Sequence, residues 1–113
     1  MDIGDIYSIE IPPSNGHEQA GIRPAIIAQA SKFEKQLPTV LIVPMTSQLA
    51  AQTFPGTFLI TPDSENGLTM PSVVLGFQLR AIDKRRLRRK IGQLNAQHLA
   101  ELRQHLKALM QLP

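Results

Sequence analysis

Short apolar segments separated by turn-forming residues dominate most of the chain and limit what it can fold into. Residues 7–11 alternate apolar and polar side chains, which is the period of a half-buried strand. Residues 39–43 are rich in β-branched side chains and form the strongest predicted strand, which we expect Pro44 to end. Further predicted strands cover residues 24–28, 57–60, 72–75 and 78–82, with a break at Gly76. Five or six short strands of this kind favour a small β-barrel.

The period of the apolar residues changes near the C-terminus. Asn95 is a good residue to cap the N-terminus of a helix. Leucines then recur at spacings of three and four, at Leu99, Leu102, Leu106 and Leu109. This stripe predicts a C-terminal helix of about four turns that packs on the barrel. We therefore expect a mainly β fold with a C-terminal helix, and the length of 113 residues fits a single domain spanning 1–113.

The net charge of +3 is unevenly distributed along the chain. Residues 1–66 contain three basic and seven acidic side chains, whereas residues 67–113 contain nine basic and two acidic ones. Residues 83–90 alone hold six basic side chains in eight positions. A basic half indicates a polyanionic partner such as nucleic acid, although an ordinary solvated basic surface has the same composition.

Several classes of site are excluded or disfavoured by composition. The chain has no cysteine, which removes disulfides, zinc fingers and thiol catalysis and fits a reducing cytoplasm. The acidic N-terminus does not resemble a secretory signal, and no apolar run reaches the roughly 18 residues of a membrane span. Neither a glycine-rich phosphate loop nor a metal-binding motif is present. We expect a cytoplasmic protein that uses no metal or cofactor and has no membrane partner.

A polar loop between Gly16 and Pro24 is the most informative candidate site. It carries a histidine, a carboxylate, an amide and a guanidinium, namely His17, Glu18, Gln19 and Arg23. Rigid strands commonly position the side chains of such loops for binding or catalysis, although an ordinary surface turn would have a similar sequence.

A second candidate follows the strongest predicted strand. Thr46 and Ser47 carry hydroxyls that can donate hydrogen bonds to a phosphate, and Gln48 follows them. Serine and threonine at the end of a strand also form simple turns, so this signal is weak by itself.

Taken together, these segments resemble the MazF/PemK family of toxin endoribonucleases, which belong to type II toxin–antitoxin pairs. The resemblance covers nearly the whole chain, and its pieces occur in the family's order. They are Gly4-Asp5-Ile6-Tyr7, residues 16–24, residues 39–48, Asn66-Gly67-Leu68, residues 72–75 and residues 78–87.

The resemblance implies a Src-homology-3-like barrel of the PemK/CcdB type with short helices, assembled as a two-fold homodimer. It also implies sequence-selective, metal-independent cleavage of single-stranded RNA and neutralisation by a cognate antitoxin protein. The family's catalytic positions fall on Arg23, Thr46 and Glu18. The predicted RNA-binding residues are His17, Gln19, Ser47, Gln48, Arg80, Arg85 and Arg86.

The chemistry of RNA cleavage suits these residue types. RNA supplies its own nucleophile, the 2′-hydroxyl, so the enzyme has to stabilise charge on the phosphoryl oxygens and move protons. The planar guanidinium of Arg23 can hold two such oxygens, and the Thr46 hydroxyl can donate to them. A guanidinium is hard to deprotonate, so Glu18 and His17 are the candidate general bases. His17 departs from the family's usual small residue, which leaves its own role open. The pair Gly76-Phe77 also departs from the family's usual residues, which leaves the preferred RNA sequence and the dimer open.

Two other functions remain open at this point. The first is a non-catalytic barrel that binds a protein target such as gyrase, as CcdB-type toxins do. The second is a nucleic-acid-binding module that uses the basic residues 84–90 and does not cleave.

Overall fold

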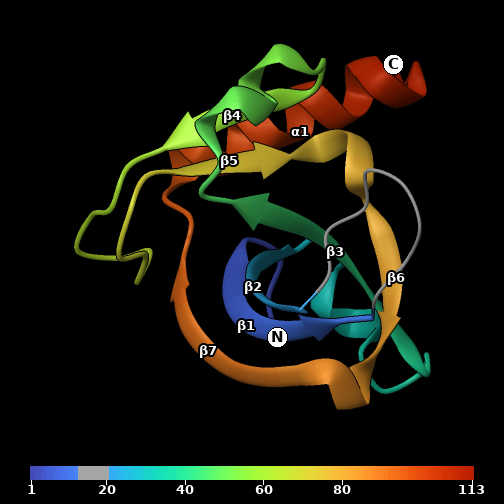
Figure 1. The fold of residues 1–113 in the computed structure, drawn as a ribbon. Coiled ribbons are helices and arrows are strands. Elements are labelled where there is room, and N and C mark those ends of the chain that lie inside the picture. The colour runs from blue at the N-terminus through green and yellow to red at the C-terminus, as the bar shows by residue number, and fades with distance from the viewer. Residues whose placement is uncertain (13–20) are drawn as a thin grey trace.

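The computed structural model describes residues 1–12 and 21–113, and the strands in these ranges form one strongly curved sheet (Figure 1). The strands are β1 (Asp5–Ile11), β2 (Gly21–Ile27), β3 (Thr39–Thr46), β4 (Thr57–Ile60), β5 (Ser72–Leu75), β6 (Arg80–Asp83) and β7 (Leu87–Gln93). Short 3₁₀ turns separate them, namely η1 (Ser31–Phe33), η2 (Leu49–Thr53), η3 (Gly76–Gln78) and η4 (Lys84–Arg86). The single α-helix of these ranges, α1 (Ala96–Met110), follows β7.

The strands pair in the order β4-β5-β3-β2-β1-β7, and every pairing is antiparallel. The first half of β3 also pairs with β6. Figure 1 shows β1 and β7 curling around β2, while α1 lies along β4 and β5. The predicted mainly β fold with a C-terminal helix is confirmed.

Both faces of β2 are buried because it is a central strand. Ile26 lies in one apolar cluster together with Val43 and Leu102, beneath α1. Ala25 and Ile27 point to a second cluster, formed with residues of β1, β3 and β6. The C-terminal end of β2 is therefore a continuous apolar run. Residues 21–23, at its N-terminal end, are exposed and lie outside the core.

Strand β3 does not end at Pro44, contrary to the sequence prediction. It continues to Thr46 because its pairing partner changes along its length. Its first half pairs with β6, and Met45 and Thr46 pair with Val74 and Val73 of β5. Pro44 lies where the partner of β3 changes from β6 to β5. Its missing backbone N–H therefore interrupts neither of these two pairings.

Strand β7 was not predicted, because its sequence is dominated by cations. It pairs with β1, and its apolar residues Leu87 and Ile91 are only half-buried. Bulges in the β1–β7 pairing fall between Ile6 and Tyr7 and between Ser8 and Ile9. An exposed edge strand can be basic along one face, so it lacks the apolar alternation that identifies a buried strand.

The predicted C-terminal helix is confirmed, including its cap. The Asn95 side chain accepts a hydrogen bond of 2.8 Å from the backbone N–H of His98. Leu102 is buried in the core, whereas Leu109 at the end of the stripe is 41% exposed. In the part of the chain that the structure describes, no helix has the length and apolar character needed to cross a membrane.

Candidate active site

A cavity of about 320 Å³ opens beside the N-terminal end of β2 and the C-terminal end of β3. Arg23, Thr46 and Ser47 all line it. The remaining described lining residues are Ser8, Ile22, Pro24, Met45, Gly67, Leu68, Thr69, Met70, Ser72, Arg89 and Ile91. Its volume lies at the lower end of the roughly 300–1,000 Å³ range of small-ligand sites, which suits one nucleotide better than a large substrate.

The register of the sheet explains why Arg23 and Thr46 share this cavity. Strands β2 and β3 pair Ala25 with Pro44. Continued by two residues, the same antiparallel register places Arg23 opposite Thr46. Arg23 itself pairs with Ile9 of β1, and its side chain lies in the exposed part of β2. It forms no ion pair with any carboxylate in the described ranges, so its guanidinium is available to an anion.

Thr46 is held in place by its own turn. It is 6% exposed and ends β3, where it pairs with Val73. Its Oγ1 accepts a 3.2 Å hydrogen bond from the backbone N–H of Gln48. A hydroxyl that accepts one bond keeps its hydrogen for donation. Thr46 can therefore donate to a phosphoryl oxygen inside the cavity.

Gln48 is not among the described residues that line the first cavity. It lines a second, smaller cavity of about 210 Å³ together with Thr46, Phe54 and Phe77. The rings of Phe54 and Phe77 are tilted against each other with centroids 5.1 Å apart. Thr46 therefore lines both cavities.

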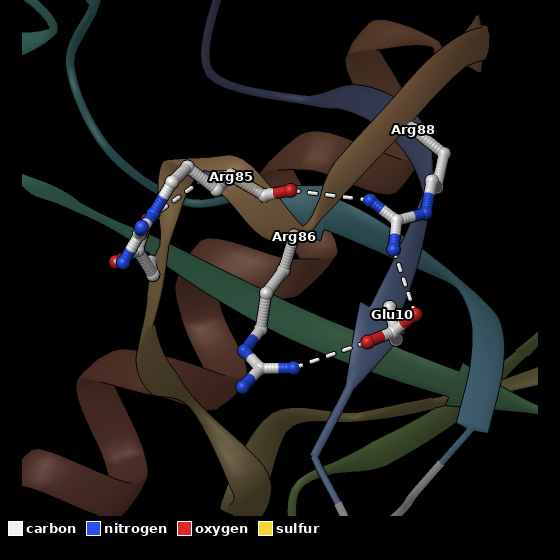
Figure 2. Close-up of polar contacts among 5 residues, drawn as sticks. Glu10, Arg85, Arg86 and Arg88 are labelled. Atoms are coloured by element: carbon white, nitrogen blue, oxygen red, sulfur yellow. Dashed lines mark hydrogen bonds and ion pairs between the residues drawn. The ribbon is translucent and has the colours of Figure 1, made fainter.

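Two predicted RNA contacts, Arg85 and Arg86, lie in a separate polar cluster (Figure 2). Glu10 accepts hydrogen bonds from Arg86 at 3.2 Å and from Arg88 at 2.7 Å. Arg85 forms an ion pair of 2.9 Å with Asp83. Hydrogen bonds from the side chain and backbone of Arg85 lower the pKa of Asp83 to about 2, so this carboxylate stays ionised at any physiological pH.

The other predicted site residues fall into two groups. Arg80 begins β6, where it pairs with Ile42 of β3, and it is not among the described residues that line the first cavity. His17, Glu18 and Gln19 lie outside the described residues.

With this geometry established, comparison with known proteins identifies the family. The family model of PemK-like, MazF-like toxins of type II toxin–antitoxin systems matches residues 2–110. The chain belongs to this toxin family. It is 34% identical over 102 residues to Endoribonuclease MazF of Staphylococcus saprophyticus, covering 90% of this chain and 84% of that protein.

Solved structures of MazF toxins share the fold. MazF of Deinococcus radiodurans (Form I) aligns with a TM-score of 0.81 at 28% identity, over 98% of this chain and 96% of that one. MazF in a MazE–MazF structure from the same organism (Form II) aligns with a TM-score of 0.75 at 29% identity, over 100% and 97% of the two chains. The resemblance to the MazF/PemK family is therefore confirmed.

Sequence reasoning about this family member missed part of the cavity wall. The segment Gly67–Met70 and Ser8 line the cavity, although neither was singled out as a site. Arg89 was seen only as one cation in the basic run. Its alternation with Arg88 and Lys90 could have shown that Arg89 faces a different side from those two cations, because neighbouring strand residues face opposite sides. That signal required β7 to be recognised as a strand.

Proposed function

We propose that this toxin-family protein is a sequence-selective, metal-independent endoribonuclease that cleaves single-stranded RNA such as mRNA. The observation that carries the proposal is the shared cavity, which is lined both by Arg23, with no ion pair among the described residues, and by Thr46, whose hydroxyl is positioned by its own turn. The Staphylococcus relative, named an endoribonuclease, supports the same activity. Residues 1–113 would act as one domain.

The proposed reaction uses the substrate's own 2′-hydroxyl. The 2′-oxygen attacks the adjacent phosphorus and gives its proton to a general base, for which Glu18 and His17 are the candidates. The bond from phosphorus to the 5′-oxygen breaks, and that oxygen takes up a proton. The products are a 2′,3′-cyclic phosphate and a 5′-hydroxyl end.

Arg23 and Thr46 would stabilise the charge that develops on the phosphoryl oxygens. Arg23 supplies a positive charge and two parallel donors, and Thr46 supplies a further hydrogen bond. Ser47, which also lines the cavity, can donate to the same phosphate. Because arginine provides the positive charge, the proposed step requires no metal ion.

The proposal includes partners and location. A cognate antitoxin is supported by the description of the family, whose toxins belong to type II toxin–antitoxin systems. A two-fold homodimer is expected from the resemblance. The absence of cysteine agrees with a reducing cytoplasm.

Purified protein incubated with a long single-stranded transcript in EDTA tests the activity directly. The proposal predicts a reproducible set of cuts that persist in EDTA. Salt-sensitive binding with intact RNA would instead indicate a nucleic-acid-binding module. Neither binding nor cleavage, by protein shown to be folded, would favour the barrel that binds a protein target.

Replacing Thr46 with valine should lower the single-turnover cleavage rate constant by about 100-fold, because a transition-state donor is lost. Thr46→Ser keeps the hydroxyl and should stay within about tenfold of the parent protein. Thermal unfolding of both variants checks the fold, since the valine also removes the acceptor for the Gln48 N–H. Equal rates for Thr46→Val and the parent would contradict a role for this hydroxyl.

A further inference from the structure

Most cations of the basic run, residues 84–90, are already held by acceptors within the molecule. The Lys84 ammonium donates to the backbone carbonyl of Glu34, and the Lys90 ammonium lies 3.3 Å from a carboxylate oxygen of Asp5. The remaining partnered members of the run are Arg85 with Asp83, and Arg86 and Arg88 with Glu10. Three carboxylates, those of Asp83, Glu10 and Asp5, therefore offset half of the six positive charges in this run.

Arg89 is the exception in this run. Its side chain is exposed, and it forms no ion pair or hydrogen bond with the side chains of residues 1–12 and 21–113. It lines the same cavity as Arg23. Arg89 and Ile91 line the cavity, whereas Arg88 and Lys90 reach Glu10 and Asp5, as the alternation of a strand requires.

The sheet fixes the spacing of the backbones that carry Arg23 and Arg89. Arg89 pairs with Ser8 of β1, and on the other side of β1 the same Ser8 pairs with Pro24, next to Arg23. Strands β2 and β7 flank β1, so their backbones lie about 10 Å apart at this point. Because Arg23 and Arg89 both line the cavity, their side chains can contact different phosphates of one RNA strand.

Part of the cavity wall is apolar and exposed. Ile22 is 56% exposed and Met70 is 52% exposed, and both line the cavity with Leu68. Exposed apolar side chains provide a surface against which a nucleobase can lie, while flanking cations hold its phosphates. The apolar side chains and the cations of this cavity thus match the base and the phosphates of a nucleotide.

We infer that Arg89 is a second RNA-binding cation of this cavity and holds a phosphate adjacent to the scissile one. This inference rests on the proposed nuclease function and deepens it. A phosphate is favoured over a base edge because the guanidinium is exposed and no polar side chain of residues 1–12 and 21–113 fixes its orientation, as reading a base would require. Arg89 would therefore contribute to binding of any RNA sequence and act mainly on affinity.

The test compares Arg89→Gln, Arg89→Lys and Arg103→Gln with the parent protein. Arg103 is a matched control, because it is an exposed arginine on α1 that does not line the cavity. The binding probe is a fluorescein-labelled, mixed-sequence 2′-O-methyl RNA 20-mer, in which every nucleophile is blocked. Fluorescence anisotropy gives Kd at several salt concentrations, and cut positions are mapped separately on an unmodified transcript.

Arg89→Gln should weaken binding about tenfold and reduce the slope of log Kd against log salt concentration by about 0.7, the value for one phosphate contact on a single strand. Arg89→Lys should restore most of the slope, and Arg103→Gln should match the parent. Cut positions should not change. The rate constant at saturating RNA should fall much less than the affinity does.

Three results would overturn the assignment. The first is an Arg89→Gln slope equal to that of Arg103→Gln. The second is a change in cut positions with an unchanged slope, which would indicate that Arg89 reads a base. The third is an Arg89→Lys variant no better than Arg89→Gln. If the parent binds the probe but cuts no transcript, the nuclease proposal fails, while the slopes still decide whether Arg89 binds phosphate.

Discussion

Arg23→Ala should lower the single-turnover rate constant of RNA cleavage by about 1,000-fold or more. Removing one neutral donor to a developing oxyanion typically costs about 100- to 1,000-fold, and Arg23 provides both a charge and two donors. Its side chain lies in the exposed part of β2, so the substitution leaves the core intact. The measurement uses saturating protein and a short RNA that contains one mapped cut site.

Two further variants distinguish a role of Arg23 in the chemical step from a general effect of positive charge on the protein surface. Arg23→Lys keeps the positive charge but loses the planar fork, so it should recover only part of the lost rate. Arg103→Ala removes an exposed arginine from α1 and should leave the rate within about twofold of the parent, because distant surface charges are screened. An Arg23→Ala protein that cleaves within about tenfold of the parent would remove this residue from the mechanism.

Gly67→Ala should destabilise the fold by about 3 kcal/mol and deform the cavity. Gly67 has a φ of +68°, and an added Cβ would lie 1.9 Å from the backbone oxygen of Ile91. The cost combines the left-handed backbone of a non-glycine residue with overlap against the backbone of a neighbouring strand. For a chain of this length, we expect the midpoint of thermal unfolding to fall by about 10 °C or more.

The overlap between an added Cβ at position 67 and β7 also predicts an effect on RNA binding. The turn ending at Gly67 lies against β7, since the backbone N–H of Gln93 donates to the carbonyl of Glu65 at 3.0 Å. This contact helps to position the segment 67–70, which lines the cavity together with Arg89. Displacing it should weaken RNA binding even below the unfolding temperature.

Gly4→Ala is the matched control for backbone strain. Gly4 has a φ of +92°, but its added Cβ would make only ordinary contacts with Leu99, at 3.4 Å or more. It should therefore cost only about 1–2 kcal/mol, the price of the left-handed conformation alone. Comparable unfolding midpoints for Gly67→Ala and Gly4→Ala would show that the turn at Gly67 does not pack closely against the backbone of β7.

The pairing of Arg23 with Thr46 in one cavity follows from features that the sequence carries. Both residues adjoin strongly apolar strands, and adjacent antiparallel strands bring the start of one beside the end of the next. The resemblance to the toxin family then indicated which of the polar residues next to these strands are the catalytic candidates. The turn at Asn66-Gly67 and the strands β4 and β5 were likewise marked by local signals, because turn residues bound them on both sides.

The parts that could not be predicted depend on contacts between distant residues. Glu10 is 76 positions from Arg86 in the chain, so nothing local indicates that it would form hydrogen bonds with two arginines. The run of cations therefore looked like an open RNA-binding patch, with Arg85 and Arg86 as contacts. The continuation of β3 past Pro44 depends in the same way on a partner strand more than 25 residues later.

Cleavage of a transcript with a single 2′-deoxynucleotide at a mapped cut site tests the central claim most directly. The account predicts that the cut at that position disappears in EDTA while cuts at unmodified positions continue, because only the missing 2′-hydroxyl can attack there. The remaining cuts should leave a 2′,3′-cyclic phosphate and a 5′-hydroxyl end. Continued cleavage at the 2′-deoxynucleotide would contradict the mechanism built on Arg23 and Thr46.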